Sequence, residues 1–137
     1  MDKYFPYKEL SYKIVGIFFR IRNNYGNFHK ELIYQNAFEE ELKDLKIPFK
    51  REIEIPIFSS KSGKKLGFYR ADFLIDNKII VEIKALKFVP QKLEQQIFKY
   101  LKSTSYEVGY LVNFGSTNFF FKRFILSNIF KQSAKSA

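Results

Sequence analysis

The sequence predicts an α/β chain of the α+β kind, with a mixed sheet of about five strands flanked by helices in the order ααβββαββ. Two segments with helical spacing come first, alternating strands follow, and another helical segment separates the third strand from the fourth. At 137 residues, with 46% hydrophobic residues and 17 phenylalanines, the chain can bury a core of its own. We expect a single domain over residues 1–137, with 127–137 as a tail.

The N-terminal part is predicted to form two helices and a strand. Apolar residues recur at helical spacing in Glu9–Asn23 and again in His29–Leu45. The buried stripe of the second helix is expected to hold Tyr34, Phe38, Leu42 and Leu45. Phe49–Phe58 alternates and predicts a strand. One side of that strand is expected to carry Phe49, Arg51, Ile53, Ile55 and Ile57.

The rest of the chain is predicted to form a hairpin, a helix and two further strands. Leu66–Ile75 and Ile79–Lys84 are the hairpin strands. Pro90–Lys102 is the helix, because proline suits the first helical turn. Val108–Val112 is an uncharged strand that we expect to be covered on both faces, and Asn118–Leu126 is the last strand.

Composition excludes several classes of site. The chain has no cysteine, which rules out disulfides and thiolate metal sites, and its single histidine, His29, rules out multi-histidine sites. The segment MDKYFPYKEL lacks the apolar centre of a signal peptide, and no run approaches the roughly 18 apolar residues of a membrane helix. We therefore expect a cytoplasmic protein.

The charge is strongly basic, at +10 from 24 basic and 14 acidic side chains. Such an excess favours a polyanionic partner, and nucleic acid is the commonest. A host whose proteins are generally rich in lysine is the alternative, and charge alone does not separate the two.

The hairpin ADFLIDNKIIVEIKA carries three charges outside its turn, Asp72, Glu82 and Lys84. A two-residue turn would set Asp72 opposite Val81 and mix charges among apolar residues. A three-residue turn sets Asp72 opposite Glu82 and leaves the other face of the hairpin entirely apolar. That apolar face consists of Ala71, Phe73, Ile75, Ile79, Val81, Ile83 and Ala85. The polarity pattern favours this second register, in which Arg70 and Lys84 share the carboxylate face.

Two facing carboxylates repel, so one would hold a proton unless a cation lies between them. Magnesium prefers oxygen ligands and often needs only one or two protein carboxylates. Lys84, on the same face as Glu82, is suited to stabilising an anionic transition state. A charge cluster on a solvated sheet face is the alternative, with Lys84 paired to Asp72 or Glu82.

Two other segments carry residues of interest. Glu31 lies near the start of the second helix, where the helix dipole alone favours a carboxylate. Gln96 and Tyr100 are four residues apart and share one face of the third helix, where they are suited to orienting a ligand or water beside the hairpin. A place at the edge of the core is the alternative for this pair.

These pieces together resemble the PD-(D/E)XK nuclease superfamily and, within it, the small GxxExxY subgroup. The resemblance rests on the segments GNFHKELIY, GFYRADF, IVEIKA, QIFKY and LVNFG, and extends over most of the chain. It implies a restriction-endonuclease-like core. Ala71 stands where the superfamily name has proline, and Phe28 where the subgroup has glycine.

The resemblance further implies a metal-dependent nuclease that hydrolyses phosphodiester bonds, most of all in DNA, with Mg²⁺ or Mn²⁺ as cofactor. By this likeness Asp72, Glu82, Lys84 and Gln96 are the catalytic set. The implied metal ligands are Asp72, Glu82, the backbone carbonyl of Ile83 and Glu31. The implied contacts to substrate are Arg70 and Tyr100.

Two alternatives from other classes stay open. One is a nucleic-acid-binding module that keeps the fold without catalysis, since fold does not guarantee activity. The other is an oligomeric interaction protein, because three consecutive phenylalanines, Phe119 to Phe121, must occupy both faces of one strand. Core packing is the favoured explanation for those phenylalanines.

Overall fold

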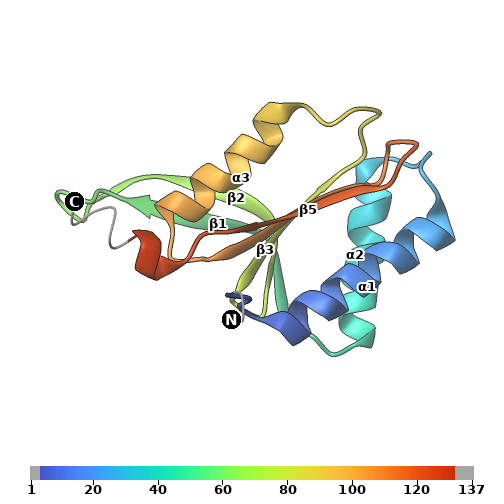
Figure 1. Ribbon diagram of the computed structural model, residues 1–137, viewed down its shortest axis with the longest axis horizontal. Coiled ribbons are helices and arrows are strands. Elements are labelled where there is room, and N and C mark those ends of the chain that lie inside the picture. The colour runs from blue at the N-terminus through green and yellow to red at the C-terminus, as the bar shows by residue number, and fades with distance from the viewer. Residues whose placement is uncertain (1–3, 132–137) are drawn as a thin grey trace.

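The computed structural model describes residues 4–131, and its elements follow the predicted order (Figure 1). The helices are α1 (Lys8–Tyr25), α2 (Glu31–Asp44) and α3 (Gln91–Ser103). The strands are β1 (Phe49–Phe58), β2 (Lys65–Ile75), β3 (Ile79–Lys84), β4 (Val108–Asn113) and β5 (Phe120–Ile125). Residues 128–131 form one helical turn, and the rest of the predicted tail lies outside the described residues.

The five strands form one mixed sheet in the order β1-β2-β3-β4-β5. Only β3 and β4 run parallel, and the other neighbours are antiparallel. A parallel pair needs a long crossover connection, which α3 supplies between β3 and β4. The predicted α/β class, with a mixed sheet flanked by helices, is confirmed.

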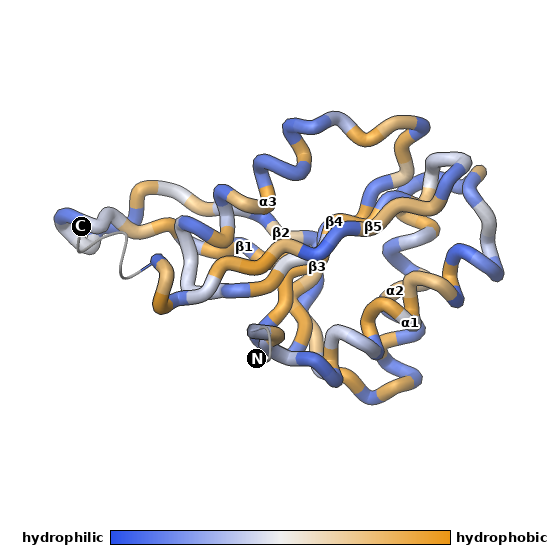
Figure 2. The backbone as a smooth tube through the Cα atoms, viewed as in Figure 1, coloured by the Kyte–Doolittle hydropathy of each residue, from blue (hydrophilic) through white to orange (hydrophobic). Residues whose placement is uncertain are grey.

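Helices cover both faces of the sheet, α1 and α2 on one and α3 on the other (Figure 1). Strands β3 and β4 are almost completely buried, which confirms the prediction that Val108–Val112 is covered on both faces. Helix α3 is largely hydrophilic with short apolar stretches (Figure 2), as expected for a helix that buries only Ile97 and Leu101.

The three consecutive phenylalanines at the start of β5, residues 119–121, lie mainly in the core. Phe119 and Phe121 both pack against the ring of Phe19 on α1, and Phe121 also contacts Phe18. Phe120 is half-buried. Packing within the chain therefore explains this run without a partner protein.

The predicted buried face of α2 wrongly includes Leu45, its last member. Leu45 is 43% exposed, whereas Tyr34, Phe38 and Leu42 are fully buried. Helix α2 stops at Asp44, so Leu45 leaves the helical spacing, and Ile47 enters the core in its place. No helix within residues 4–131 is long and apolar enough to cross a membrane.

Strands β1 and β2 exchange faces halfway along their length, contrary to the continuous alternation expected from sequence. Phe73 packs with the α1 and α2 side, but Ala71, two residues away, packs under α3. Their partners on β1 behave alike, since Arg51 pairs with Phe73 and Ile53 with Ala71. The residue between them, Glu52, has a φ of 52°, which twists the strand pair at this point. The predicted shared faces for Ala71 with Phe73, and for Phe49 with Ile53, are therefore wrong.

Candidate active site

The central hairpin adopts the predicted three-residue turn. Ile75 pairs with Ile79 and Phe73 with Val81, and extending this register sets Asp72 opposite Glu82. Asp76 and Asn77 take left-handed φ angles of 51° and 55° in the turn. Short polar side chains such as these tolerate that conformation better than others, so no glycine is required.

The two carboxylates replace part of the backbone pairing at the open end of the hairpin. Oδ2 of Asp72 accepts a 2.8 Å hydrogen bond from the Ile83 N–H, and Oε1 of Glu82 accepts a 3.3 Å bond from the Asp72 N–H. Each carboxylate is thereby held by the backbone of the opposite strand. A carboxylate that accepts such bonds is fixed in orientation, as a ligand or catalytic group must be.

Burial and the neighbouring Asp72 raise the pKa of Glu82 to about 8. Lys84 and a hydrogen bond from Tyr69 act in the opposite direction but do not compensate. Without a cation, the pair therefore holds a proton at neutral pH. This is the behaviour expected of two carboxylates placed to share a positive charge.

Tyr69 is a member of the site that sequence reasoning missed. Its hydroxyl donates a 2.8 Å hydrogen bond to Oε1 of Glu82, and its ring stacks on that of Tyr100. Burial next to Glu82 strongly raises the pKa of Tyr69, so the hydroxyl stays protonated and acts as a donor. Simple alternation puts Tyr69 and Asp72 on opposite faces, and only the exchange of faces at Asp72 brings both to Glu82.

A cavity of about 190 Å³ collects most of the predicted site residues. Its walls include Asp72, Glu82 and Lys84 from the hairpin and Gln96 and Tyr100 from α3. The Gln96 amide donates to the Tyr100 hydroxyl, so the predicted shared face of that pair is confirmed.

Arg70 also lines this cavity, but its side chain is 63% exposed and forms a 3.4 Å ion pair with Glu54. It therefore lies at the rim, where a group on a bound substrate could replace the weak surface pair.

Glu31 lies at the first residue of α2, apart from the hairpin cavity but within electrostatic range of it. Burial raises its pKa, nearby Lys84 lowers it and Asp72 raises it. Gln35, one turn along α2, donates a 3.3 Å hydrogen bond to Glu31 and is itself held by Arg51. The Glu31 carboxyl therefore lies close enough to Asp72 and Lys84 to interact electrostatically with both.

The loop before Glu31 is anchored by Tyr34. The buried Tyr34 hydroxyl donates to the Gly26 carbonyl at 2.8 Å and accepts from the His29 N–H at 3.2 Å. The Tyr34 ring stacks on Phe114 at the end of β4, with the ring planes 11° apart. These contacts explain the glycine and tyrosine of GNFHKELIY as residues that position the start of α2.

The segment LVNFG fixes the chain directly after Glu82, at residues 84–86. Oδ1 of Asn113 accepts a 2.8 Å bond from the Leu86 N–H, and its Nδ2 donates a 2.8 Å bond to the Leu86 carbonyl. The Phe114 N–H bonds to the carbonyl of Lys84 at 2.9 Å. Gly115 approaches this backbone so closely that a Cβ would lie 2.5 Å from atoms of Ala85 and Leu86. Lys84 is thus held rigidly at the end of β3.

The donor set suits a hard divalent cation. Asp72 and Glu82 offer carboxylate oxygens, and burial beside Asp72 raises the pKa of Glu82, as expected where no cation neutralises the pair. Within residues 4–131, no three His, Cys, Asp or Glu side chains lie close enough together to hold a metal. The two carboxylates fit an ion that keeps several waters, and the metal roles of Glu31 and the Ile83 carbonyl stay predictions.

This combination of mixed sheet, crossover helix and carboxylate hairpin defines a restriction-endonuclease-like protein. The family model described as the PD-(D/E)XK nuclease superfamily matches residues 8–124, so the chain belongs to that superfamily. Its membership of the GxxExxY subgroup stays a prediction.

Among solved structures, the chain is similar to the crystal structure of SSO0001, with a TM-score of 0.53 and 23% sequence identity. The alignment covers 76% of this chain and 55% of the other, so the chain spans about half the length of that structure. At this identity the likeness concerns the fold alone. No curated protein sequence matches the chain.

Proposed function

We propose that this chain is a metal-dependent nuclease that hydrolyses phosphodiester bonds in DNA. The observation that carries the proposal is the convergence of Asp72, Glu82 and Lys84 on one cavity, with Glu82 buried and its pKa raised to about 8. Buried charges are costly, and a perturbed carboxyl pair in a cavity is typical of a catalytic site. Membership of the nuclease superfamily supports the same reaction class.

In this proposal Asp72 and Glu82 hold the cation, with Ile83 supplying a carbonyl ligand and Glu31 adding negative charge or a further ligand. When bound, Mg²⁺ or Mn²⁺ lowers the pKa of a coordinated water and neutralises phosphate charge. The backbone bonds to Asp72 and Glu82 orient both carboxylates before substrate arrives. Tyr69 is a positioning residue, because it touches Glu82 rather than the reacting atoms.

The remaining side chains act on water and phosphate. Lys84 faces the carboxylates and would stabilise the negative charge of the pentavalent transition state. Gln96 and Tyr100 form the opposite wall and would orient the attacking water or a phosphate oxygen. Arg70, at the exposed rim, would bind a neighbouring phosphate.

The test is cleavage of plasmid and of single-stranded DNA with Mg²⁺ or Mn²⁺. The wild type should cut, EDTA should stop the reaction, and Glu82→Gln should be inactive. Lys84→Met should lower kcat by about 100- to 1,000-fold if it stabilises the transition state. The matched control Glu40→Gln, an exposed carboxyl on α2, should keep full activity. DNA binding without metal-dependent cleavage would instead indicate the non-catalytic module.

A further inference from the structure

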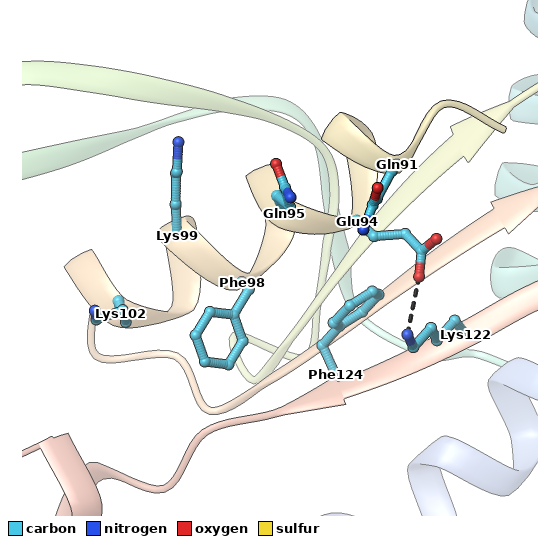
Figure 3. A pocket seen from close by; sticks show the side chains of 8 residues that line it. All are labelled: Gln91, Glu94, Gln95, Phe98, Lys99, Lys102, Lys122 and Phe124. Atoms are coloured by element: carbon cyan, nitrogen blue, oxygen red, sulfur yellow. Dashed lines mark hydrogen bonds and ion pairs between the residues drawn. The ribbon is translucent and has the colours of Figure 1, made fainter.

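The hairpin cavity is too small for a nucleotide. At about 190 Å³ it falls below the roughly 300–1,000 Å³ typical of ligand pockets. A phosphate and its waters fit such a space, so the bases of a bound strand must lie elsewhere. A second hollow of about 840 Å³ lies between α3 and β5 (Figure 3). This α3/β5 groove is lined by Gln91, Glu94, Gln95, Phe98, Lys99, Lys102, Lys122 and Phe124.

The groove and the cavity lie on the same face of the sheet. Glu82 is in register with Leu111 on β4, and Leu111 is in register with Lys122 on β5. Two strand spacings of about 4.8 Å put the Glu82 and Lys122 backbones ~10 Å apart. A stacked strand covers that distance in about three nucleotides at ~3.4 Å each.

Helix α3 separates the two spaces and contributes to both. At 3.6 residues per turn, Gln96 and Tyr100 face the cavity and Phe98 lies on the opposite side of the helix. Gln95 and Lys99 lie between these two faces, and both line the groove. A strand bound across α3 would therefore meet residues of this one helix on either side.

The groove combines positive charge with aromatic surface. Its three lysines and one glutamate give a formal charge of +2, and Glu94 is already paired with Lys122 at 2.9 Å. Phe98 comes from α3 and Phe124 from β5 (Figure 3). The Phe124 ring is half-buried against the core, with the Lys122 ammonium 5.2 Å from its centre. Phe98 is 42% exposed. Basic residues around accessible ring faces are typical of sites for single-stranded nucleic acid.

We propose that the α3/β5 groove binds unpaired nucleotides of a DNA strand whose scissile phosphate lies at Asp72 and Glu82. The inference rests on the proposed nuclease function, and it names the substrate class as DNA with an unpaired strand. Phe98 stacks on a base, and Lys99 and Lys102 contact phosphates. Bases within a duplex stack on each other, so their faces are not accessible to Phe98.

Binding is tested without metal, in EDTA, by fluorescence anisotropy of a labelled single-stranded DNA oligonucleotide and of its duplex. Phe98→Ala should weaken single-strand binding by about 5- to 100-fold, the effect of losing one stacked base, and leave duplex binding unchanged. Phe98→Tyr should retain the affinity. The matched control is Phe68→Ala, which removes a 51% exposed ring that also lies near a lysine. Circular dichroism and thermal melting verify that each variant folds.

Equal single-strand affinity for the wild type and Phe98→Ala would overturn the inference, as would an equal loss for the duplex. Tighter binding of the matching RNA would overturn the choice of DNA. The proposed function is tested separately. Phe98-dependent binding with no cleavage in Mg²⁺ or Mn²⁺ would contradict the nuclease function and support the groove as a binding site. Metal-dependent cleavage with no contribution from Phe98 to binding would support the nuclease function and contradict the role of the groove.

Discussion

The Tyr69 hydroxyl donates a 2.8 Å hydrogen bond to the same Glu82 oxygen that accepts the Asp72 N–H. This bond is one of the influences that lower the pKa of Glu82. Replacing Tyr69 with phenylalanine should therefore raise the Glu82 pKa further and leave its carboxyl less firmly oriented. We expect Tyr69→Phe to reduce cleavage by about 10- to 100-fold, the usual cost of losing a group that orients a metal ligand.

The diagnostic readout for Tyr69→Phe is the pH profile of kcat/KM. Its acidic limb should move to higher pH, because Glu82 must lose its proton before it can bind a cation. Tyr106→Phe is a suitable control, since that hydroxyl donates a 3.4 Å hydrogen bond to Asn77 in the hairpin turn and not to Glu82. A uniform loss of activity without movement of the limb would mean that Tyr69 does not act through Glu82.

Stability should depend on pH through Glu82. Its pKa rises from an ordinary 4.5 to about 8 on folding, so the folded chain keeps a proton that the unfolded chain loses between these values. The unfolded state binds fewer protons there, and the contribution of Glu82 to the free energy of unfolding falls as pH rises. Glu82→Gln should gain stability relative to wild type between about pH 5 and 8 in EDTA.

Urea denaturation at several pH values across that window checks the prediction for Glu82. The quantity to compare is the difference in unfolding free energy between Glu82→Gln and the wild type. A difference that stays constant with pH would show that Glu82 titrates normally in the folded chain.

Much of the fold could be read from the sequence because apolar periodicity was strong. The three-residue turn after Ile75 followed from the polarity of the hairpin alone, since a two-residue turn would mix Glu82 and Lys84 among apolar side chains. The exchange of faces at Asp72 could not be predicted, because it depends on a left-handed φ at Glu52, a residue with no special preference for it. Tyr69 was missed for the same reason. Its only local signal was a tyrosine three residues before Asp72.

The long-range supports of the site were also beyond sequence reasoning. Asn113 lies 27 residues from Leu86, and its side chain bonds to both backbone groups of that residue. The motif LVNFG contains Asn113, but nothing in the composition of the motif indicates which backbone segment the asparagine side chain binds. Similarly, the α3/β5 groove depends on how two elements far apart in the sequence bring Phe98 and Phe124 to one hollow.

Divalent cations should stabilise the folded chain, and more so at high pH. A cation binds the deprotonated pair of Asp72 and Glu82, so it competes with the shared proton. At 100-fold above its Kd, an ion that binds only the folded state adds about 2.7 kcal/mol. We expect Mg²⁺ or Mn²⁺ to raise Tm more at pH 8 than at pH 6.

The controls for the metal effect are Asp72→Asn and Glu82→Gln, which should lose the rise in Tm, and EDTA, which should reverse it in the wild type. Isothermal calorimetry in buffers of different ionisation enthalpy should detect proton release on binding at neutral pH. An equal rise in Tm for the wild type and both variants would assign the effect to ions bound elsewhere.

Gly115 should be intolerant of any side chain. A Cβ at this position would lie 2.5 Å from the Ala85 carbonyl carbon and the Leu86 nitrogen, which are backbone atoms that cannot turn aside. We expect Gly115→Ala to destabilise the chain by about 1–3 kcal/mol, as other over-packed sites do, and to displace Lys84 from the carboxylates. Gly67→Ala is the matched control, since a Cβ there meets nothing within 4 Å. Urea denaturation and cleavage assays of both variants measure the two effects, and equal stability for them would contradict a rigid contact between β4 and the end of β3.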